Sequence, residues 1–394
     1  MKRRGAGVRS TAPLSPGLAA PDGRRSGAAR PDGLGGICRQ LQLAARSGLS
    51  SRRSRGGSPP GRGADVRAVV ITERGGPEVL ALREVAEPSP GPFELLVDVA
   101  ASALNRADLL QRRGLYPAPP GAPADIPGLE FAGTVLSVGE AVTRFAAGDR
   151  VMGVVGGGAA AERLAIHERE AMRCPEGLAL TESAAIPEAF ATAFDAAVLQ
   201  GGLASGQWLV VNAVGSGVGT AAVQLARALG ARSVGSSRTP TKLGLARGLG
   251  LDVAVEGDST ALPAAVREAT GGAGAAVALD LVGGPGLAAM LECLRPTGTL
   301  VLVGLMGGVE ADLSLGRVLR QRLRLVGTVL RSRPLEEKMA LARAFEDRVV
   351  PLFEGADAPL RPVVDRVLSW EAVADAHRAL ESNDSFGKIV LEHR

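Results

Sequence analysis

Cysteine and histidine are scarce in this chain. Its 394 residues include three of each: Cys38, Cys174, Cys293, His167, His377 and His393. The cysteines are scattered and odd in number, which argues against a disulfide framework and favours a reducing compartment. Neither residue type occurs at the spacing of a recognisable metal site, so we expect no bound metal. We expect the three histidines to lie at the surface.

Long apolar runs and an evenly spread basic charge are also missing. No run approaches the roughly 18 apolar residues of a membrane span, so we expect a cytoplasmic protein without a membrane partner. The net charge is +4, but 13 basic and 2 acidic residues precede Asp65, which leaves 32 basic and 39 acidic residues in the remainder. A mildly acidic remainder gives no reason to expect a nucleic acid partner there.

Residues 1–64 are rich in Gly, Pro, Ser and Arg and contain few large apolar side chains. Such a segment buries too little surface to offset its ordering entropy, so we expect a disordered basic tail. Two alternatives stay open. The tail resembles an Arg-rich transit peptide, which would place the protein in an organelle matrix, and it also fits a basic arm that binds nucleic acid.

The chain after the tail shows two different sequence patterns, which predict two domains. To about residue 175, short runs such as "GPFELLVDVAASAL" are broken by Gly and Pro, which predicts a β-rich, barrel-like domain. Beyond residue 183, apolar strands alternate with helices, which indicates a parallel sheet covered by helices. The expected strands are 207–214, 231–237, 251–256, 275–283, 298–305 and 323–332; the expected helices are 183–199, 219–230, 241–250, 262–271 and 285–296. A final strand, helix and strand are expected in 359–394.

A glycine turn joins the first of these strands to its helix in "NAVGSGVGTAA". Its glycines are Gly215, Gly217 and Gly219, with Ser216 and Val218 between them. Residues without a Cβ allow a pyrophosphate to approach the backbone, and the helix N-terminus then offers free N–H groups. The spacing departs from the usual fingerprint, but the strand before and the helix after the turn favour a nucleotide site over a structural corner.

The second strand of this domain ends in "SSRTPTK", which carries no acid. An NAD site needs an acidic residue there to bind the ribose 2′-hydroxyl. Arg238, Thr239 and Lys242 instead supply two positive charges and a hydroxyl group, and an arginine pairs well with a 2′-phosphate. We therefore expect NADPH as the cofactor, with a solvated basic loop as the alternative.

Several stretches together resemble a known family: "GGPEVLALREV", "AASALNRADLLQRRGLYPAPPG", "IPGLEFAGTV", "AAIPEAFATAF", "SGVGTAAVQLAR", "GLMGG", "LRSR" and "GKIVLE". The chain resembles the medium-chain dehydrogenase/reductase superfamily, especially its zinc-free quinone oxidoreductases related to zeta-crystallin, and most of all the p53-inducible quinone oxidoreductase group. The resemblance implies an α/β fold in which a doubly wound Rossmann sheet is inserted in a GroES-like catalytic domain. The implied segments are 65–185 and 332–394 for the catalytic domain and 186–331 for the cofactor domain, and 323–332 would form a homodimer edge.

The zinc alcohol dehydrogenases of this superfamily have a Cys in the loop that corresponds to "ASALNRAD" and a Gly-His-Glu at the position of "GLE". Here Leu129 replaces the histidine, and no cysteine lies between Cys38 and Cys174. Without these ligands there is no Lewis acid to stabilise an alkoxide. A substrate that spreads charge by conjugation is expected instead, either a quinone or an enone.

The resemblance also implies roles for individual residues. Tyr116 and Asn105 are the candidate catalytic residues, one as a contact or proton donor to a quinone oxygen and the other beside the nicotinamide ribose. Their alternatives are a tyrosine packed on prolines and an ordinary turn asparagine. Thr192 would contact the nicotinamide phosphate region, with an ordinary helix residue as the alternative. Leu305, Met306 and Gly307 are expected to contact the cofactor because they follow the fifth strand of the sheet, and ligands collect at the carboxyl ends of such strands. Asn383, Phe386 and Lys388 would close the other side of the cofactor, with a simple strand start at "GKIVL" as the alternative. Asp108, Arg112 and Glu130 would form either site contacts or structural ion pairs.

The sequence therefore predicts an NADPH-dependent quinone oxidoreductase that needs no zinc. The first alternative is a reductase of enones, alkenals or enoyl thioesters. The second is a nucleotide-binding or RNA-binding regulatory protein, which only the basic tail favours.

Overall fold

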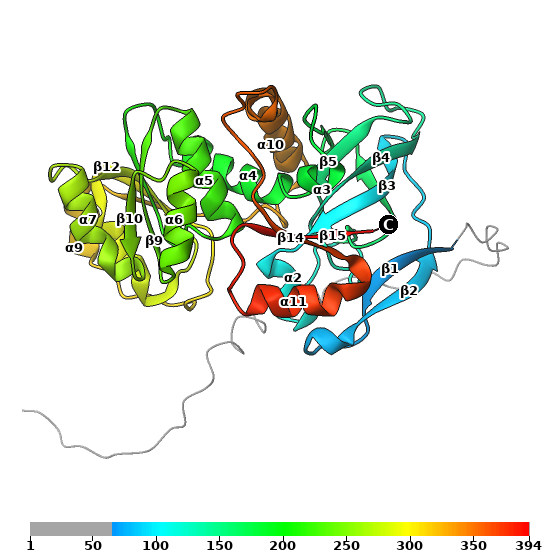
Figure 1. Ribbon diagram of the computed structural model, residues 1–394, viewed down its shortest axis with the longest axis horizontal. Helices are drawn as coiled ribbons and strands as arrows, with labels where there is room; N and C mark the ends of the chain where they lie inside the picture. The colour runs from blue at the N-terminus through cyan, green and yellow to red at the C-terminus, as the bar shows by residue number, and fades with distance from the viewer. Residues whose placement is uncertain (1–64, 394) are drawn as a thin grey trace, which may run out of the picture. The chain divides into compact units, whose positions relative to one another are not determined.

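A six-stranded parallel sheet forms one half of the described molecule (Figure 1). The computed structural model describes residues 65–393, so the predictions for the tail lie outside the described residues. The strands run in the order β10-β9-β8-β11-β12-β13. This is the doubly wound order, in which ligands bind at the carboxyl ends of the central strands. The bounds are β8 Trp208–Val211, β9 Arg232–Ser237, β10 Val253–Glu256, β11 Ala275–Asp280, β12 Leu294–Leu302 and β13 Arg324–Gly327.

Helices cover this sheet and explain its sequence pattern. All six residues of β11 are buried, as expected for a strand covered on both faces. Ala221, Ala222 and Leu225 of α5 pack into the same core as Leu209 and Val211 of β8. The bounds are α5 Gly217–Ala228, α6 Pro240–Gly248, α7 Leu262–Ala269, α8 Leu287–Glu292 and α9 Leu315–Gln321.

A second, mostly antiparallel sheet forms the other half, in the order β14-β15-β3-β4-β5-β7, with β6 paired to β3. A separate hairpin is formed by β1 and β2. The chain returns to this sheet at its end, because Val390 of β15 pairs with Ala103 of β3. The bounds are β1 Asp65–Ile71, β2 Leu80–Ala86, β3 Glu94–Ala103, β4 Glu130–Val138, β5 Arg150–Val154, β6 Arg163–His167, β7 Met172–Arg173, β14 Val364–Ser369, α11 Val373–Glu381 and β15 Lys388–Glu392.

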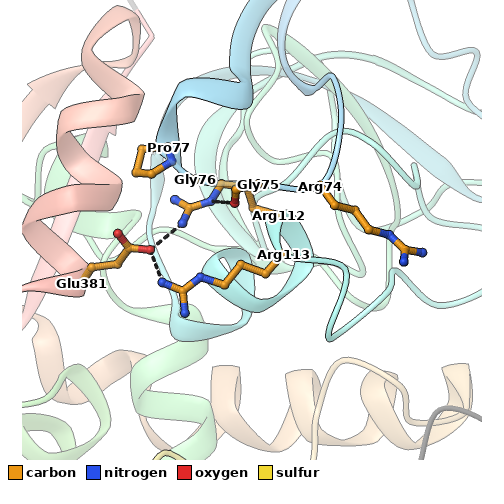
Figure 2. Close-up of a pocket in the computed structure, with 7 residues that line it drawn as sticks. All are labelled: Arg74, Gly75, Gly76, Pro77, Arg112, Arg113 and Glu381. Carbon is orange, nitrogen blue, oxygen red and sulfur yellow. Dashed lines mark hydrogen bonds and ion pairs between the residues drawn. The ribbon is translucent and has the colours of Figure 1, made fainter. Parts of the chain in front are cut away.

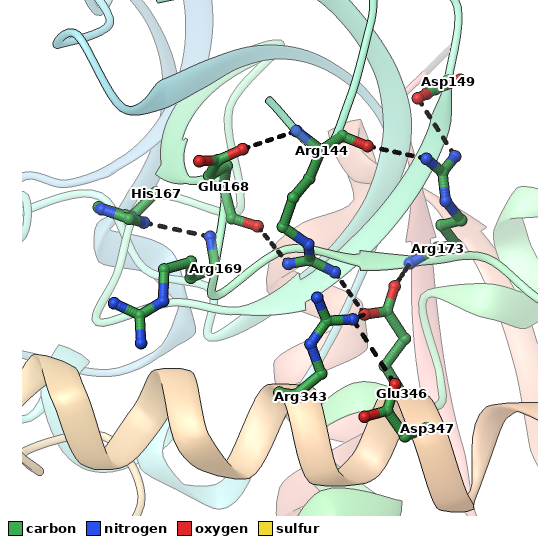
Figure 3. Close-up of polar contacts among 9 residues, drawn as sticks. All are labelled: Arg144, Asp149, His167, Glu168, Arg169, Arg173, Arg343, Glu346 and Asp347. Carbon is green, nitrogen blue, oxygen red and sulfur yellow. Dashed lines mark hydrogen bonds and ion pairs between the residues drawn. The ribbon is translucent and has the colours of Figure 1, made fainter. Parts of the chain in front are cut away.

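Helix α10, Leu335–Arg348, was not among the predicted elements; it packs against this second sheet. Its Glu346 is held by several arginines, as Figure 3 shows. The carboxylate of Glu346 accepts hydrogen bonds from Arg144 Nη2 at 2.5 Å, from Arg343 Nη1 at 3.0 Å and from the backbone N–H of Arg173 at 3.0 Å. Arg173 also pairs with Asp149 at 3.2 Å. Through Arg144 and Arg173, Glu346 therefore ties α10 to the loop between β4 and β5 and to β7.

Several predicted elements have different bounds in the structure, and three of them show why. The helix expected at 183–199 is broken into α3 Leu180–Ser183, α4 Pro187–Phe194 and a π-helical turn, Asp195–Gln200, because Pro187 starts a new helix. The helix expected at 285–296 ends at Glu292, since β12 begins at Leu294. The strand expected at 323–332 ends at Gly327.

The prediction of surface histidines is wrong for two of the three. His377 and His393 are each 2% exposed. His377 Nδ1 lies 3.1 Å from Arg112 Nη1, and burial, with Arg112 beside it, lowers the pKa of His377 to about 3. His393 stacks on Trp370 and hydrogen-bonds Ser102 at 2.9 Å; burial lowers its pKa to about 4. Both are therefore neutral core residues.

The described residues contain no helix that is both long and apolar enough to cross a membrane.

Candidate active site

The glycine turn lies at the carboxyl end of β8, beside the point where the strand order reverses. Ser216 caps α5, because its Oγ accepts a hydrogen bond from the N–H of Gly219 at 3.0 Å. At the start of α5, no described residue accepts a hydrogen bond from the N–H of Val218, and the N–H of Gly217 faces Gly387 in the isolated bridge between Ser216 and Gly387. An open N–H group at a helix N-terminus suits a phosphate group.

Close packing requires glycine in this turn. A Cβ on Gly219 would lie 2.6 Å from the backbone oxygen of Ala213 and 2.8 Å from Val214 Cα. A Cβ on Gly217 would lie 2.6 Å from Lys388 Cδ. The turn thus keeps its backbone open to a ligand and lets α5 pack tightly on β8, which are the two uses of glycine in a dinucleotide-binding turn. The residues present therefore fit a dinucleotide.

The basic residues after β9 lie beside the turn. Lys242 packs over Gly215, where a Cβ would meet its Cδ at 2.7 Å, and its Nζ donates a hydrogen bond to the backbone oxygen of Asn383. Burial lowers the pKa of Lys242, with nearby Arg238 adding to the effect and Asp384 opposing it. Arg238 itself is exposed, and Thr239 begins α6 as its N-cap. This end of the strand is thus positively charged.

The segment between α11 and β15 closes on the same turn. The N–H of Gly387 donates to the oxygen of Gly215 at 3.0 Å. Asn383 has a positive φ of 61° and accepts a hydrogen bond from Arg106 Nη2 at 2.5 Å. Phe386 is held through its N–H by Asp365 at 2.8 Å. Arg106, which the sequence analysis did not single out, thereby joins Lys242 beside the turn.

The loop after β12 also lies at the carboxyl edge of the sheet. Leu305 and Met306 are more than half exposed, at 52% and 55%. Gly307 donates a hydrogen bond from its N–H to the oxygen of Val282 at 2.7 Å, and a Cβ on Gly284 would lie 2.3 Å from the oxygen of Gly307. The loop is thus fixed to the end of β11, with two apolar side chains left uncovered.

A buried ion pair forms the base of the site on the catalytic side. Lys388 Nζ lies 2.6 Å from Glu130 Oε1, and the two residues are 6% and 0% exposed. The same Nζ donates to the oxygen of Leu104 and to Asn105 Oδ1, each at 2.7 Å. Asn105 Nδ2 donates in turn to Glu130 Oε1 at 3.0 Å. Asn105 is therefore part of a buried network and more than a turn residue.

Two further carboxyl groups lie beside this pair. Asp108 accepts hydrogen bonds from the N–H groups of Asn105 at 2.8 Å and Gly128 at 3.0 Å, yet burial raises its pKa to about 6. Glu188, at the start of α4, donates its N–H to Glu130 Oε2 at 2.8 Å. Burial, and then the charge of Glu130, raise the pKa of the Glu188 side chain to about 7.

Tyr116 faces this cluster with Arg331 stacked on its ring. The guanidinium carbon of Arg331 lies 5.1 Å from the ring centroid, and Arg331 Nη1 donates to the backbone oxygen of Tyr116 at 3.2 Å. Arg331 also donates to Gly156 O at 2.8 Å and Gln111 Oε1 at 2.6 Å. Burial raises the pKa of the Tyr116 hydroxyl, against the charge of Arg331. Arg331 thus fixes the tyrosine loop to the cofactor half.

Of the predicted site residues, the structure brings Asn105, Lys388 and Gly217 together, with Lys242 and Asn383 in contact on the other side of the turn. Thr192 lies one turn after Glu188 on α4, and its buried Oγ1 has no hydrogen-bond partner among the described residues. Glu188 and Arg331 were not predicted from the sequence to be site residues. The signal for both was weak: Glu188 is a charged residue inside the otherwise apolar stretch "AAIPEAF", and Arg331 directly follows the apolar run "LVGTVL".

A surface pocket of about 360 Å³ lies at the far end of α2, Arg106–Arg112, from this cluster (Figure 2). Arg112 and Arg113 both point toward Glu381 there, each at 2.5 Å from its Oε1. Arg112 Nε also donates to Gly75 O at 3.0 Å. The prediction of a structural ion pair fits Arg112, whose partner is Glu381 of α11. None of the predicted catalytic or cofactor residues lines this pocket.

Comparison with known proteins identifies both halves of the chain. Residues 91–176 match the family described as "Alcohol dehydrogenase GroES-like domain", and residues 217–346 match "Zinc-binding dehydrogenase". Among the described residues, no three His, Cys, Asp or Glu side chains are grouped so as to hold a metal ion.

Individual relatives cover nearly the whole described chain. A quinone oxidoreductase of Pseudomonas aeruginosa is 33% identical over 322 residues, which are 80% of this chain and 96% of the relative. The solved quinone oxidoreductase of Pseudomonas syringae pv. Tomato DC3000 superposes with a TM-score of 0.72 at 27% identity, covering 83% of this chain and 99% of that one. A solved NAD-dependent alcohol dehydrogenase gives a TM-score of 0.72 at 32% identity, covering 83% and 100%. The chain therefore belongs to the medium-chain dehydrogenase/reductase superfamily, where quinone oxidoreductases are among its relatives.

Proposed function

We propose that this oxidoreductase uses NADPH to reduce quinones and does so without zinc. The observation that carries the cofactor choice is the positive charge around the glycine turn. Lys242 and Arg106 contact the same residue, Asn383, and Arg238 follows β9 directly. A 2′-phosphate gains ion pairs there, whereas the acid that would bind a free ribose hydroxyl is missing from the end of β9.

When bound, NADPH supplies a hydride to the substrate. The backbone N–H groups at the start of α5, that of Val218 first among them, would hold its pyrophosphate, and Thr192 Oγ1 offers an unpartnered hydroxyl on the catalytic side. Asn105 and Lys388 form a rigid base beside the turn, so the reacting groups need little reorganisation.

Zinc independence is supported by the charges of the cluster. Leu129, which precedes Glu130, is buried and has no ligand atom. The carboxylate of Glu130 is already neutralised by Lys388 at 2.6 Å. A quinone needs no Lewis acid for its reduction, because conjugation spreads the charge that the hydride brings.

The cofactor proposal predicts that Arg238→Ala weakens NADPH binding and leaves NADH binding nearly unchanged. A charge-assisted hydrogen bond contributes about 1.5–3 kcal/mol, so the Kd for NADPH should rise roughly 10- to 100-fold. Fluorescence titration of both cofactors measures this. Arg247→Ala is the matched control, since Arg247 is an exposed arginine in the last turn of α6. Equal affinity of the wild type for NADPH and NADH, unchanged in Arg238→Ala, would contradict the proposal.

A side-by-side assay of NADPH oxidation with para-quinones, ortho-quinones and alkenals tests the substrate class.

We also propose a homodimer through the outer edge of β13. Within residues 65–393, no strand pairs with that edge. Apolar side chains are exposed around it: Leu315 and Leu319 of α9 at 76% and 77%, and Leu325 of β13 at 45%. An uncovered apolar edge invites pairing with another chain. Light scattering after size exclusion should give twice the chain mass, and Leu325→Lys should yield a monomer. A monomeric wild type at micromolar concentration would refute this.

A further inference from the structure

Helix α4 carries two buried polar atoms that have no partner. Glu188 Oε2 and Thr192 Oγ1 are both solvent-inaccessible and lack a hydrogen bond among the described residues. They are four residues apart, so they lie on one face of the helix, one turn from each other. An unpartnered buried polar atom costs about 1–3 kcal/mol. Two of them on one face indicate that a ligand with polar groups completes the site.

The neighbouring cations cannot satisfy Glu188. Lys388 has three N–H donors, and these go to Leu104 O, Asn105 Oδ1 and Glu130 Oε1. The described contacts of Arg331 go to Gly156, Tyr116 and Gln111. Both cations attract the carboxylate of Glu188 only through space, and neither donates a hydrogen bond to it.

Burial is the main reason that Glu188 favours its protonated form. Glu130 on β4 and Asp108 on α2 add to this by repelling its carboxylate, Lys388 on β15 and Arg331 after β13 oppose it, and the pKa of Glu188 is raised to about 7. The charge of Glu188 also acts on the Tyr116 hydroxyl group and contributes to raising its pKa, after burial. The carboxyl group is therefore near half protonation at neutral pH, where a general acid works best.

Glu188 also lies next to the cofactor turn. The residue after it, Ala189, is a near neighbour of Gly217, with 3.6 Å between Ala189 Cβ and a Cβ built on Gly217. Glu188 as a whole is half-buried, and its Oε2 is buried. A carboxyl group in this position can reach a substrate beside the turn.

We propose that Glu188 is the proton donor of the reduction, a role that rests on the proposed function. When the hydride has added to the quinone, one substrate oxygen carries a negative charge. The O–H bond of the Glu188 carboxyl group then breaks, its proton forms a new O–H bond on that oxygen, and the carboxylate takes a proton from solvent. Two electrons and one proton come with the hydride and the second proton comes from Glu188, which completes a hydroquinone.

The test is Glu188→Gln, a replacement of nearly the same shape. We expect kcat with a para-quinone at about pH 6 to fall by roughly 100-fold or more, because positioned general acids contribute about 10²–10⁴-fold. The KM for NADPH should change by less than about threefold. In the wild type kcat should decline as pH rises through about 7, because the carboxyl group loses its proton there. This decline should disappear in Glu188→Gln and remain in Tyr116→Phe.

A second readout needs no turnover. The infrared difference spectrum between about pH 6 and pH 8 should contain the carbonyl bands of two protonated carboxyl groups, Asp108 and Glu188, and Glu188→Gln should remove the Glu188 band while that of Asp108 remains. Glu268→Gln, which changes an exposed acid on α7, should alter neither readout. If the wild type reduces quinones but Glu188→Gln keeps the same pH profile, or loses affinity for NADPH alone, the inference is wrong. If the wild type reduces no quinone, the proposed function fails, and the infrared band alone then supports or overturns a proton on Glu188.

Discussion

Replacement of Gly219 by alanine is expected to abolish NADPH binding and to lower the free energy of unfolding by about 2–3 kcal/mol. The new Cβ would lie 2.6 Å from the backbone oxygen of Ala213 and 2.8 Å from Val214 Cα. Backbone atoms cannot move aside as a flexible side chain can. The start of α5 would have to shift away from β8, and the N–H groups of Gly217 and Val218 would shift with it.

Gly244→Ala provides the matched control in the same domain. Gly244 lies within α6, and a Cβ there would meet nothing within 4 Å. Because glycine is less favourable than alanine in a helix by about 0.8–1 kcal/mol, this variant should be slightly more stable than the wild type and bind NADPH normally. Urea unfolding and fluorescence titration measure both quantities. A Gly219→Ala protein that keeps wild-type stability and affinity would show that the turn tolerates a side chain and is no cofactor cradle.

The glycine turn could be predicted because its signal is local. The strand, turn and helix lie within 24 residues of sequence. Each has its own local signal: an apolar run for the strand, Ser216 as the cap of the helix, and glycine where two backbone segments meet. The parallel sheet covered by helices was also predicted correctly from the residues, whereas its doubly wound type and the GroES-like domain came from the family resemblance.

The buried cluster of charged residues beside the glycine turn could not be predicted, because its members come from distant parts of the chain. Glu130, Glu188 and Lys388 lie on β4, α4 and β15, and nothing in their local sequences says that they meet. The burial of His377 was not predicted for the same reason, because its partner Arg112 is 265 residues away in the sequence. A charged residue in an apolar stretch indicates that another group neutralises its charge, but only the fold determines which residue this is.

The largest loss of stability is expected from Lys388→Met, which keeps most of the side-chain volume and removes the charge. Lys388 Nζ is the donor in three contacts, at 2.6–2.7 Å, and its partner Glu130 is 0% exposed. Without the ammonium group, the Glu130 carboxylate stays buried with no counter-ion. Removing one partner of a buried ion pair costs about 3–5 kcal/mol, so urea unfolding should give a free energy lower by that amount.

The double variant Lys388→Met/Glu130→Gln separates the cost of an unpaired charge from the value of the pair. A neutral amide next to a methionine leaves no buried charge, and such replacements are often close to neutral for stability. We therefore expect the double variant to recover most of the stability lost in Lys388→Met. Activity should not recover, because Asn105 Oδ1 has lost its donor and Glu188 has lost two of its four charged neighbours, Glu130 and Lys388. If Lys388→Met is as stable as the double variant, Glu130 takes a proton at little cost, and the pair cannot be the rigid base of the active site.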